Sequence, residues 1–572
     1  MSSSDDLSVP DEADTKPMDF EDAMDNTTKP GSFGKYQLFL YGLFCFATTC
    51  TGALNMDLVI ILGMPKHRCS VPGYANDTFE IQGDAHQALI NASIPEGESC
   101  TTYDTAQNGS LLQQKCSQWV YDDTFYSPSV ISEFDIVCDK VILRSVTNML
   151  FMFFKILGGI VGGQISDRFG RKKVFCFSLL LMSLSKLASG FAPEIYSLMI
   201  FRGFSSCFSV AFYQTGFVWA MEFVGSSKRQ IAGMASNFFF AFGVCLVTPL
   251  AYFIRNWRHL TFAITGPCVF FFGYWWLIEE SPRWLITNGR RKEAEDIIRK
   301  VAKFNGKSDA LPAGPLFEGT KDKEDQEVVP EKTVNCCTIM KNKTLAVRLI
   351  CLSINWAAVS AAYYGLSLNS GNLSGDIYIN YLVTGLIEIP AYIYALFAPM
   401  KFGRKYTHAF AMIVGGTACI VSIFPVIFGG SSLSWLITTL STIGKFGASA
   451  SFASVYIWTA EMTPTSMRVV TLGITSTAAR VASMIAPYIT DLGMLIVGPF
   501  SKALPLIILG AFGLLAGIFS FTLPETLGRP LPETIEDALL LGRAPKISTE
   551  DANQTELEQL NGKQSNGSAV KA

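Results

Sequence analysis

Twelve apolar stretches, each long enough to cross a lipid bilayer as a helix, are distributed along this chain of 572 residues. A helix needs roughly 20 apolar residues to span the hydrocarbon core. Those of the first half lie near 36–62, 144–165, 174–192, 195–221, 231–254 and 259–278. Those of the second half lie near 345–368, 377–398, 406–428, 433–459, 469–491 and 502–523. Lipid offers no hydrogen bonds to the backbone, so we expect an all-α membrane protein with twelve transmembrane helices.

A short motif follows the second apolar stretch of each half. Residues 163–172 read G-x-x-x-D-R-x-G-R-K, with Asp167, Arg168 and Arg171 among its charged members, and MKFGRK at Met400–Lys405 repeats its core. Glycine permits a tight turn, and Arg and Lys hold that turn on the cytosolic face of a membrane. Two copies of one helix-to-loop junction predict two pseudo-symmetric six-helix halves, an architecture typical of transporters.

The distribution of cations predicts the orientation in the membrane. If the first helix runs outward, one side of the membrane collects Arg168, Arg171, Lys172, Lys173, Lys228, Arg229, Lys401, Arg404, Lys405 and Arg468. Positive charge is enriched on cytosolic loops, so both termini are expected in the cytosol. The acidic segment 1–33 lacks the basic start and apolar run of a signal peptide. The net charge of -3 and the lack of a basic tract do not indicate a nucleic-acid partner.

Composition divides the chain into five expected segments. They are a disordered cytosolic N-tail (1–33), a first six-helix half (34–278), a cytosolic linker (279–344), a second six-helix half (345–523) and a cytosolic C-tail (524–572). Apolar residues at helical spacing near 294–302 predict that the linker begins with an amphipathic helix lying under the bundle.

A long loop, 65–142, follows the first apolar stretch. It holds four cysteines, Cys69, Cys100, Cys116 and Cys138, and three N-glycosylation sequons, at Asn76, Asn91 and Asn108. Glycan acceptors together with cysteines predict an extracellular, oxidising location with two disulfides. Four cysteines allow three pairings, and their spacing does not choose among them.

Several longer motifs resemble those of the organic ion transporter family of the major facilitator superfamily. They are the end of the first loop (WVYDDTFYSPSVISEFDIVCD), ESPRWL at Glu280–Leu285, YYGLSLN at Tyr363–Asn369, GDIYIN at Gly375–Asn380, EIPAY at Glu388–Tyr392, the segment Gly444–Arg468 and LPETLGRPLPETIED at Leu523–Asp537. The resemblance covers about residues 34–540. It implies the major facilitator fold and a transporter of organic cations, of carnitine-like zwitterions or of organic anions.

Charges inside apolar stretches are candidates for the substrate site, because a charge in lipid is costly. Four lie near mid-membrane: Lys155, Glu388, Lys445 and Arg480. Arg480 stands where the resemblance implies an acidic residue in cation transporters and Arg in anion and carnitine-type transporters. Arg480 either binds a substrate carboxylate or pairs with Glu388. Lys445 is expected to compensate the charge of Glu388. Lys155 either lines the cavity or pairs with Glu388 as well. Asp57 and Lys186 lie nearer the helix ends and are not expected at the site.

Aromatic residues supply the second part of the predicted site. Trp356, Tyr363 and Tyr364 are spaced seven and eight residues apart, so they share one helix face, and Tyr213 lies in the fourth stretch. Aromatic faces bind ammonium groups by cation–π attraction. The alternative is that these rings only pack.

Other charged residues are expected to act in gating. Asp167 with Arg171, and Glu461 with Arg468, are predicted to form salt bridges between the halves that close the inner gate, with Arg168 in the same motif. Arg202 and Glu222 are expected to complete the cluster in the first half. Substitution of these residues should impair turnover more than binding.

Together these features predict a plasma-membrane secondary transporter of small organic cations or zwitterions such as carnitine. An organic anion exchanger is the first alternative, and a non-transporting membrane receptor and a sugar porter are less favoured. No nucleotide-binding, metalloprotease or C-x-x-C pattern is present, so neither an enzyme nor a bound metal or cofactor is expected, and transport is facilitated or coupled to Na⁺ or H⁺. The partners expected are the substrate and the bilayer; the sequence gives no indication of oligomeric state.

Overall fold

The computed structural model describes residues 34–541 and the positions Met24 and Thr27. The exceptions within that range are 72–73, 75, 96–97, 106–110, 225–228, 313, 315, 318–339, 374, 497–499, 502 and 533. The predicted sequon Asn108, most of both predicted tails and part of the predicted linker therefore lie outside the described residues.

The first half of the bundle is built from six membrane-length helical segments. They are α2 (Lys35–Met56) continued by α3 (Leu58–Ile61), α6 (Ile142–Phe169), α7 (Arg171–Ser189), α8 (Ile195–Glu222), α9 (Arg229–Phe253), and α10 (Trp257–Thr265) continued by η3 (Gly266–Gly273) and α11 (Tyr274–Leu277). The apolar stretches predicted from the sequence fall on these segments.

The second half repeats the layout. Its segments are α15 (Lys343–Asn369), α16 (Ile377–Leu386) with α17 (Glu388–Phe402), α18 (Arg404–Val421) with α19 (Ile423–Phe428), α20 (Ser434–Met462), α21 (Thr465–Leu495) and α22 (Leu504–Ser520). Short 3-10 turns are η6 (Ser370–Asn372) and η7 (Gly430–Leu433). Within the described residues, 8 helices, counted with their short continuations, are long and apolar enough to cross a membrane, and α22 is a shorter apolar helix.

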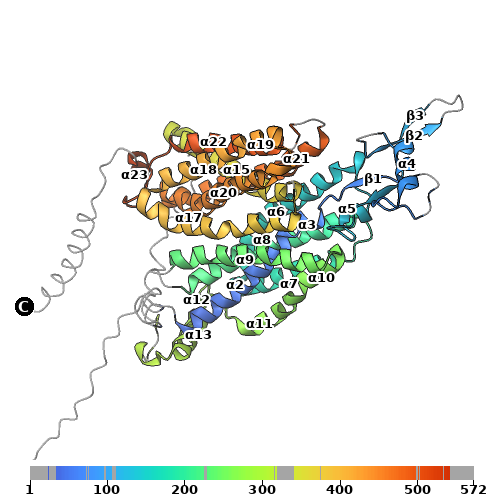
Figure 1. Cartoon of the computed structure of the whole chain (residues 1–572). Helices are drawn as coiled ribbons and strands as arrows, with labels where there is room; N and C mark the ends of the chain where they lie inside the picture. The colour runs from blue at the N-terminus through green and yellow to red at the C-terminus, as the bar shows by residue number, and fades with distance from the viewer. Residues whose placement is uncertain are drawn as a thin grey trace, which may run out of the picture.

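The two halves lie side by side, and two seams join them (Figure 1). At one seam α6 packs on α21; at the other α9 packs on α16 and α17. The second segment of the first half, α6, corresponds to α16 and α17, and the fifth, α9, corresponds to α21. A two-fold axis that exchanges corresponding segments therefore converts one seam into the other. The expected pseudo-symmetry of an all-α bundle in two halves is therefore confirmed.

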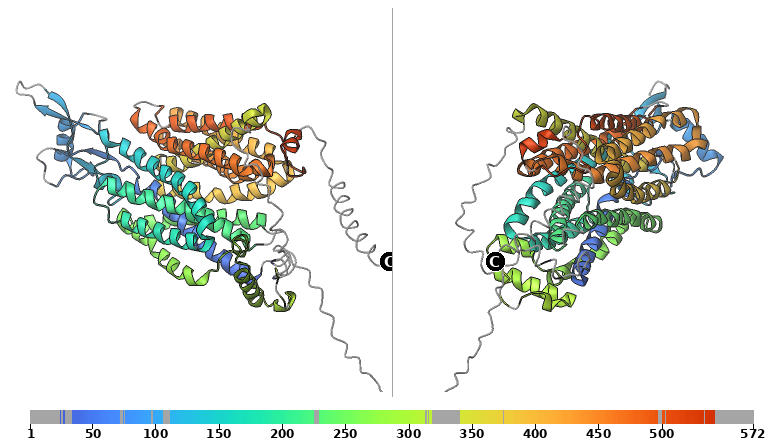
Figure 2. Two further views of the ribbon diagram at one scale, coloured as in Figure 1. Left: turned by 180° about the vertical axis from the view of Figure 1, so that it is seen from behind. Right: turned by 90° about the vertical axis from the view of Figure 1, so that its left-hand side faces the viewer.

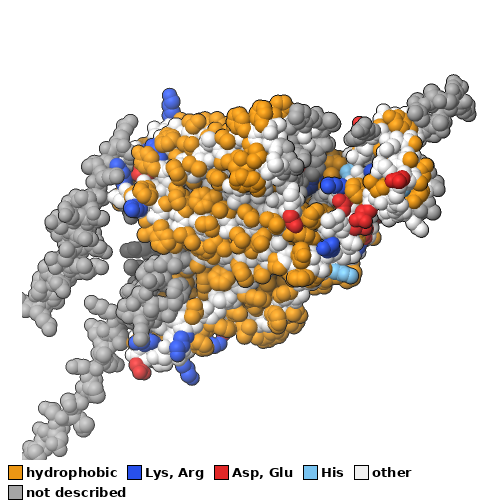
Figure 3. All heavy atoms as spheres, in the orientation of Figure 1, with side chains coloured by type: hydrophobic (Ala, Val, Ile, Leu, Met, Phe, Trp, Pro, Cys, Tyr) orange, Lys and Arg blue, Asp and Glu red, His pale blue; other side chains and the backbone are white. Residues whose placement is uncertain are grey.

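Apolar side chains cover the flank of the bundle, whereas charged side chains gather toward its two ends (Figure 3). Exposed apolar residues include Leu184 on α7, Phe410 on α18 and Ile518 on α22. A contiguous apolar surface of this extent fits contact with lipid acyl chains.

The segment between α3 and α6 forms a small capping subdomain, residues 63–141, which projects from one end of the bundle, called here the cap end (Figures 1 and 2). Strands β1 (His67–Cys69) and β4 (Trp119–Tyr121) pair antiparallel, as do β2 (Thr101–Thr105) and β3 (Leu111–Lys115). The subdomain also contains α4 (Asp84–Ser93), α5 (Val130–Glu133) and η1 (Cys138–Lys140).

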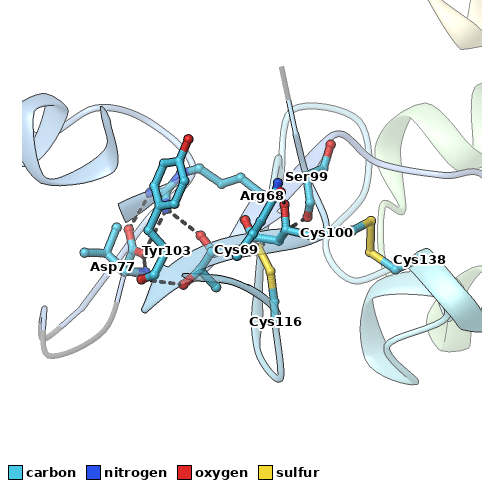
Figure 4. Close-up of a disulfide and its surroundings, with 12 residues drawn as sticks. Arg68, Cys69, Asp77, Ser99, Cys100, Tyr103, Cys116 and Cys138 are labelled. Atoms are coloured by element: carbon cyan, nitrogen blue, oxygen red, sulfur yellow. Dashed lines mark hydrogen bonds and ion pairs between the residues drawn. A yellow bond between two sulfur atoms is a disulfide. The ribbon is translucent and has the colours of Figure 1, made fainter. Parts of the chain in front are cut away.

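Two disulfides hold the capping subdomain together (Figure 4). They are Cys69–Cys116 and Cys100–Cys138, which selects one of the three pairings that the sequence allowed. Arg68 and His86 both contact the Asp77 carboxylate, His86 through Nε2 at 3.0 Å. Burial by itself raises the pKa of Asp77, but the hydrogen bonds from Arg68 and the Val71 amide outweigh it and hold that pKa below its usual value.

The opposite end of the bundle, called here the linker end, carries α12 (Pro282–Thr287), α13 (Arg291–Asn305), η4 (Ser308–Ala310) and α23 (Ile535–Leu540). Helix α13 is amphipathic, as predicted, and buries Ala294, Ile298, Val301 and Ala302. Asn305 at its end accepts a hydrogen bond from the Tyr36 amide at 2.9 Å, which fixes α13 to the start of α2.

A buried ionic cluster joins three helices of the first half. Asp57, between α2 and α3, accepts from Lys186 of α7 at 2.6 Å and from Arg202 of α8 at 2.7 Å. The three side chains are at most 2% exposed. Asp57 and Lys186, which the sequence places nearer the helix ends and outside the substrate site, do not extend to the membrane surface but are buried in this cluster. Their mutual attraction, together with Arg202, offsets the cost of burying them.

Replacing Asp57 should destabilise the first half. Asp57→Asn leaves two buried cations without an anion, which costs about 3–5 kcal/mol. We expect a lower melting temperature of the purified protein in detergent, measured by size-exclusion chromatography after heating. Lys186→Met, which keeps the Arg202–Asp57 pair, should lower it less. Equal melting of Asp57→Asn and the unmodified protein would contradict this role.

Candidate transport cavity and gates

A cavity of about 200 Å³ lies between the two halves. Helices α2, α6, α8 and α9 line it from the first half, and α15, α17, α20 and α21 from the second. Six of the eight residues predicted for the substrate site lie on its wall, namely Lys155, Tyr213, Trp356, Tyr363, Tyr364 and Arg480. The structure therefore brings together residues from α6, α8, α15 and α21 that are far apart in the sequence.

Two cations face this cavity, and no carboxylate is among the described residues that line it. Lys155 is 8% exposed, and its Nζ lies 4.6 Å from the ring centre of Phe151 and 5.1 Å from that of Tyr364. Lys155 comes from α6 of the first half and Arg480 from α21 of the second. Among the described residues, neither forms an ion pair with a carboxylate. The cavity therefore carries positive charge.

Glu388 and Lys445 lie behind the cavity wall and pair with each other. Their charged atoms are 2.9 Å apart, and both side chains are at most 3% exposed. Lys445 also donates to Ser367 Oγ at 2.6 Å and lies over the Tyr363 ring, while the Tyr392 hydroxyl donates to Glu388 at 3.0 Å. Of the alternatives left open by the sequence, Lys445 is the partner of Glu388, and neither Arg480 nor Lys155 pairs with it.

The position of Glu388 follows from a helix break. Helix α16 ends at Leu386 and α17 begins at Glu388. Pro390 has no backbone N–H to donate to the Leu386 carbonyl, so the helix is interrupted there. The break lies within the membrane-length segment and turns the Glu388 carboxylate toward α20.

Aromatic rings form one side of the cavity. The rings of Trp356 and Tyr456 are 4.2 Å apart, and those of Tyr363 and Tyr364 are 5.1 Å apart. Phe452 stacks on Tyr363 at 5.2 Å. Phe452 and Tyr456, four residues apart on α20, were not predicted from the sequence. Their spacing on one helix face was the available signal, but it is shared by many packed helices.

The cap end is closed by an ionic contact between the halves. Arg144 on α6 donates to Asp491 on α21 at 3.0 Å, and Ser145 donates to the same carboxylate at 2.6 Å. Arg144 also donates to Asn372 at 3.1 Å. Arg144 and Asp491 are at most 5% exposed. This pair lies near the helix ends, whereas the charges predicted for the substrate site lie at mid-membrane, so it was not predicted from the sequence.

The charged motifs at the linker end pair within each half, which corrects the predicted salt bridges between the halves. Arg171 contacts Asp167 at 2.9 Å and Glu222 at 3.8 Å, all in the first half.

In the second half Glu461 pairs with Arg404 at 2.9 Å, while Arg468 donates to the Ala460 carbonyl at 3.0 Å. Arg168 is exposed beside the ring of Phe169. In this arrangement the halves are in contact at the cap end, and the charged residues at the linker end pair with partners on neighbouring helices of their own half.

Arg202 belongs to neither of these clusters, contrary to prediction. It binds Asp57 near the cap end of α8, whereas Glu222 ends the same helix at the linker end. Twenty residues of helix separate the two side chains by about 30 Å. Arg202 therefore stabilises the first half internally.

The repeated motif has the same structure in both halves. Gly170 (φ 100°) and Gly403 (φ 90°) adopt conformations that favour glycine, and each begins the next helix. Glu280 accepts from the Arg171 and Lys172 amides at 2.8 and 2.9 Å, and Glu525 accepts from the Arg404 amide at 2.9 Å. Both carboxylates thus satisfy free N–H groups at a helix start. Their partners were not predicted from the sequence.

Two six-helix halves around a central cavity, joined at one end by an ion pair, are the layout of a membrane transporter. Solved structures of the E. coli xylose transporter XylE have this fold. The inward open form aligns with a TM-score of 0.57 at 17% identity, over 88% of this chain and 100% of that chain. A partially occluded inward open form aligns with a TM-score of 0.56 at 15% identity, over 86% of this chain and 99% of that chain.

Sequence comparisons identify the family. Residues 96–538 match the family model described as Sugar (and other) transporter. The Drosophila melanogaster organic cation transporter protein is 36% identical over 94% of this chain and 99% of its own length. The human organic cation/carnitine transporter 2 is 31% identical over 89% of this chain and 92% of its own length. The chain belongs to the Sugar (and other) transporter family, the relatives it resembles are organic cation and organic cation/carnitine transporters, and it is a transporter and not an enzyme.

Removing the Asp491 charge should open the cap end. In Asp491→Asn the contact with Arg144 loses its ionic part, so the closed arrangement loses stability relative to the open one. Spin labels at Ile142 and Phe500, both exposed near this end, should show a longer mean distance by pulsed electron paramagnetic resonance. Restoring a carboxylate with Asp491→Glu should shorten it again. An unchanged distance distribution in Asp491→Asn would exclude this contact as a gate.

Proposed function

We propose that this transporter carries small organic zwitterions, compounds with a carboxylate and an ammonium group such as carnitine, by alternating access. The observation that carries the proposal is the charge of the cavity. Lys155 and Arg480 line it without an acidic partner among the described residues, and Glu388, behind the cavity wall, is already paired with Lys445.

The cations provide a receptor for the carboxylate. A guanidinium offers paired donors that match a carboxylate, and such charge-assisted bonds are among the stronger polar contacts. Lys155 adds a second cation, and its side chain is only 8% exposed. A carboxylate that reaches both cations would gain from each of them.

The aromatic side provides a receptor for the ammonium group. Trp356, Tyr364 and Tyr456 line the cavity and can offer ring surface to a cation, whereas the Tyr363 ring is already covered by Lys445 and Phe452. Each suitably placed ring contributes about 0.5–2 kcal/mol to the binding of a cation. A cation held by Tyr364 lies near Lys155, so it binds favourably only if a carboxylate neutralises that lysine.

Organic anions are the second candidate class of substrate. The excess of positive charge in the cavity would serve an anion without an ammonium group equally well. The names of the relatives, which are organic cation and organic cation/carnitine transporters, favour a substrate with an ammonium group over a plain anion. A cation without a carboxylate would meet two positive charges and no lining acid, so it is the least favoured of the three.

The proposal includes an orientation in the plasma membrane. The capping subdomain with its disulfides would face the extracellular side, and the linker end and both termini would lie in the cytosol. No cofactor is required. The driving force would be the substrate gradient itself or coupling to Na⁺ or H⁺, and uptake measured in media without Na⁺ and at different pH values would distinguish them.

Arg480→Gln and Lys155→Met should each reduce the uptake of carboxylate-bearing substrates. Each removes one of two cations from a cavity without a lining acid, so the KM for labelled carnitine should rise about tenfold or more. Uptake of tetraethylammonium should not fall. Cells expressing each variant at equal surface density provide the measurement, with p-aminohippurate as the anion. If the protein takes up p-aminohippurate but not carnitine, its substrate class is organic anions and not zwitterions. Uptake of tetraethylammonium alone would contradict the proposal.

Glycan mapping tests the orientation. Asn76 and Asn91 are exposed on the capping subdomain. If that subdomain is extracellular, Asn76→Gln and Asn91→Gln should each lower the apparent mass of the protein by one N-glycan, and the step should disappear after enzymatic deglycosylation. A mass that is unaffected in both variants and insensitive to deglycosylation would argue against the orientation.

A further inference from the structure

Gln214 on α8 contacts the guanidinium of Arg480 across the interface between the two halves. Its amide oxygen lies 3.1 Å from Arg480 Nη2, and its amide nitrogen donates to the Gly159 carbonyl on α6 at 3.1 Å. This orientation of the amide is the one that satisfies both neighbours. A neutral side chain of the first half therefore holds the cation that the second half contributes to the cavity.

Gly159 leaves the room that the guanidinium occupies. A Cβ atom at this position would lie 2.9 Å from Nη2 and 3.0 Å from Cζ of Arg480. Contacts this short force one partner to move, so a larger residue would displace the guanidinium from its place against α6. Gln214 and Gly159 together fix Arg480 without using a charge.

The neutrality of this contact has a consequence for charge. An amide oxygen accepts one hydrogen bond and leaves the full positive charge on the guanidinium, which retains its other donors. A carboxylate at the same position would form an ion pair and cancel that charge. Since the cavity has no lining acid among the described residues, the side chain at 214 controls how much of the Arg480 charge remains for a substrate.

We propose that Gln214 is a specificity-determining residue: it positions Arg480 while leaving its charge free for the carboxylate of the substrate. The inference rests on the proposed function and extends it to a residue outside the cavity lining. It predicts that a change of one atom type, from amide nitrogen to oxygen, shifts the transporter from carboxylate-bearing substrates toward cations.

The test compares Gln214→Glu with the unmodified transporter. The substrates are labelled carnitine, p-aminohippurate and tetraethylammonium, and uptake is normalised to surface density measured by biotinylation. Glutamate matches glutamine in shape, so the variant is expected to fold. The KM for carnitine should rise about tenfold or more, because a charged hydrogen bond to the substrate is lost. Uptake of tetraethylammonium should stay the same or increase.

Three further variants separate positioning from general damage. In the Arg480→Gln background, adding Gln214→Glu should no longer raise the KM for carnitine, because no guanidinium charge is left to cancel. Gly159→Ala should raise the KM for carnitine but not that for tetraethylammonium. Gly42→Ala, on the exposed face of α2 where a Cβ meets no atom within 4 Å, is the matched control and should change neither.

The outcomes distinguish the two proposals. If the unmodified protein transports carnitine and Gln214→Glu leaves its KM unchanged, or lowers the uptake of every substrate in parallel, the role of Gln214 is overturned while the proposed function stands. If the unmodified protein transports only tetraethylammonium, the proposed function fails and this inference fails with it.

Discussion

A charged side chain at the centre of a lipid bilayer costs about 2.5–3.5 kcal/mol or more, and the charges of this transporter are arranged around that cost. Asp57 is surrounded by two cations from neighbouring helices, and Glu388 is paired with Lys445. Lys155 and Arg480 are the exceptions, since they face the central cavity without an acid. The candidate substrate site is thus where two cations have no acidic partner among the described residues, and a carboxylate of the substrate would supply that partner.

The same cost accounts for ionic clusters inside each half. The Asp57 cluster lies within the first half and the Glu388–Lys445 pair within the second, and the Gly170–Glu280 and Gly403–Glu525 junctions repeat one carboxylate-to-amide contact in each. Contacts between the halves lie at the two seams and at the cap end, where Arg144 pairs with Asp491. In the proposed alternating-access motion, these interface contacts would break while each internal cluster stays intact.

Selectivity in such a cavity depends on few atoms. Between buried helices, one uncompensated charge has a larger effect than it has at a protein surface. An amide at position 214 and a carboxylate there would occupy the same volume, yet they would leave different charges on Arg480. Relatives with one fold can therefore differ in the charge of their substrates through single substitutions, while the helices and gates stay the same.

The sequence by itself determined the twelve helical segments, the two halves, the cysteine-bearing loop and six of the residues that line the cavity. These depend on local properties: apolar length, turn-forming glycines, and charged or aromatic residues at depth. The tertiary structure alone decided the partner of each charge. It paired Glu388 with Lys445, placed Arg202 beside Asp57, and kept Arg171 and Glu461 within their own halves. It also chose the disulfide pairing and brought Gln214 to Arg480. Each of these partners comes from a distant segment, and the spacing of residues along a chain does not specify which helix packs beside which.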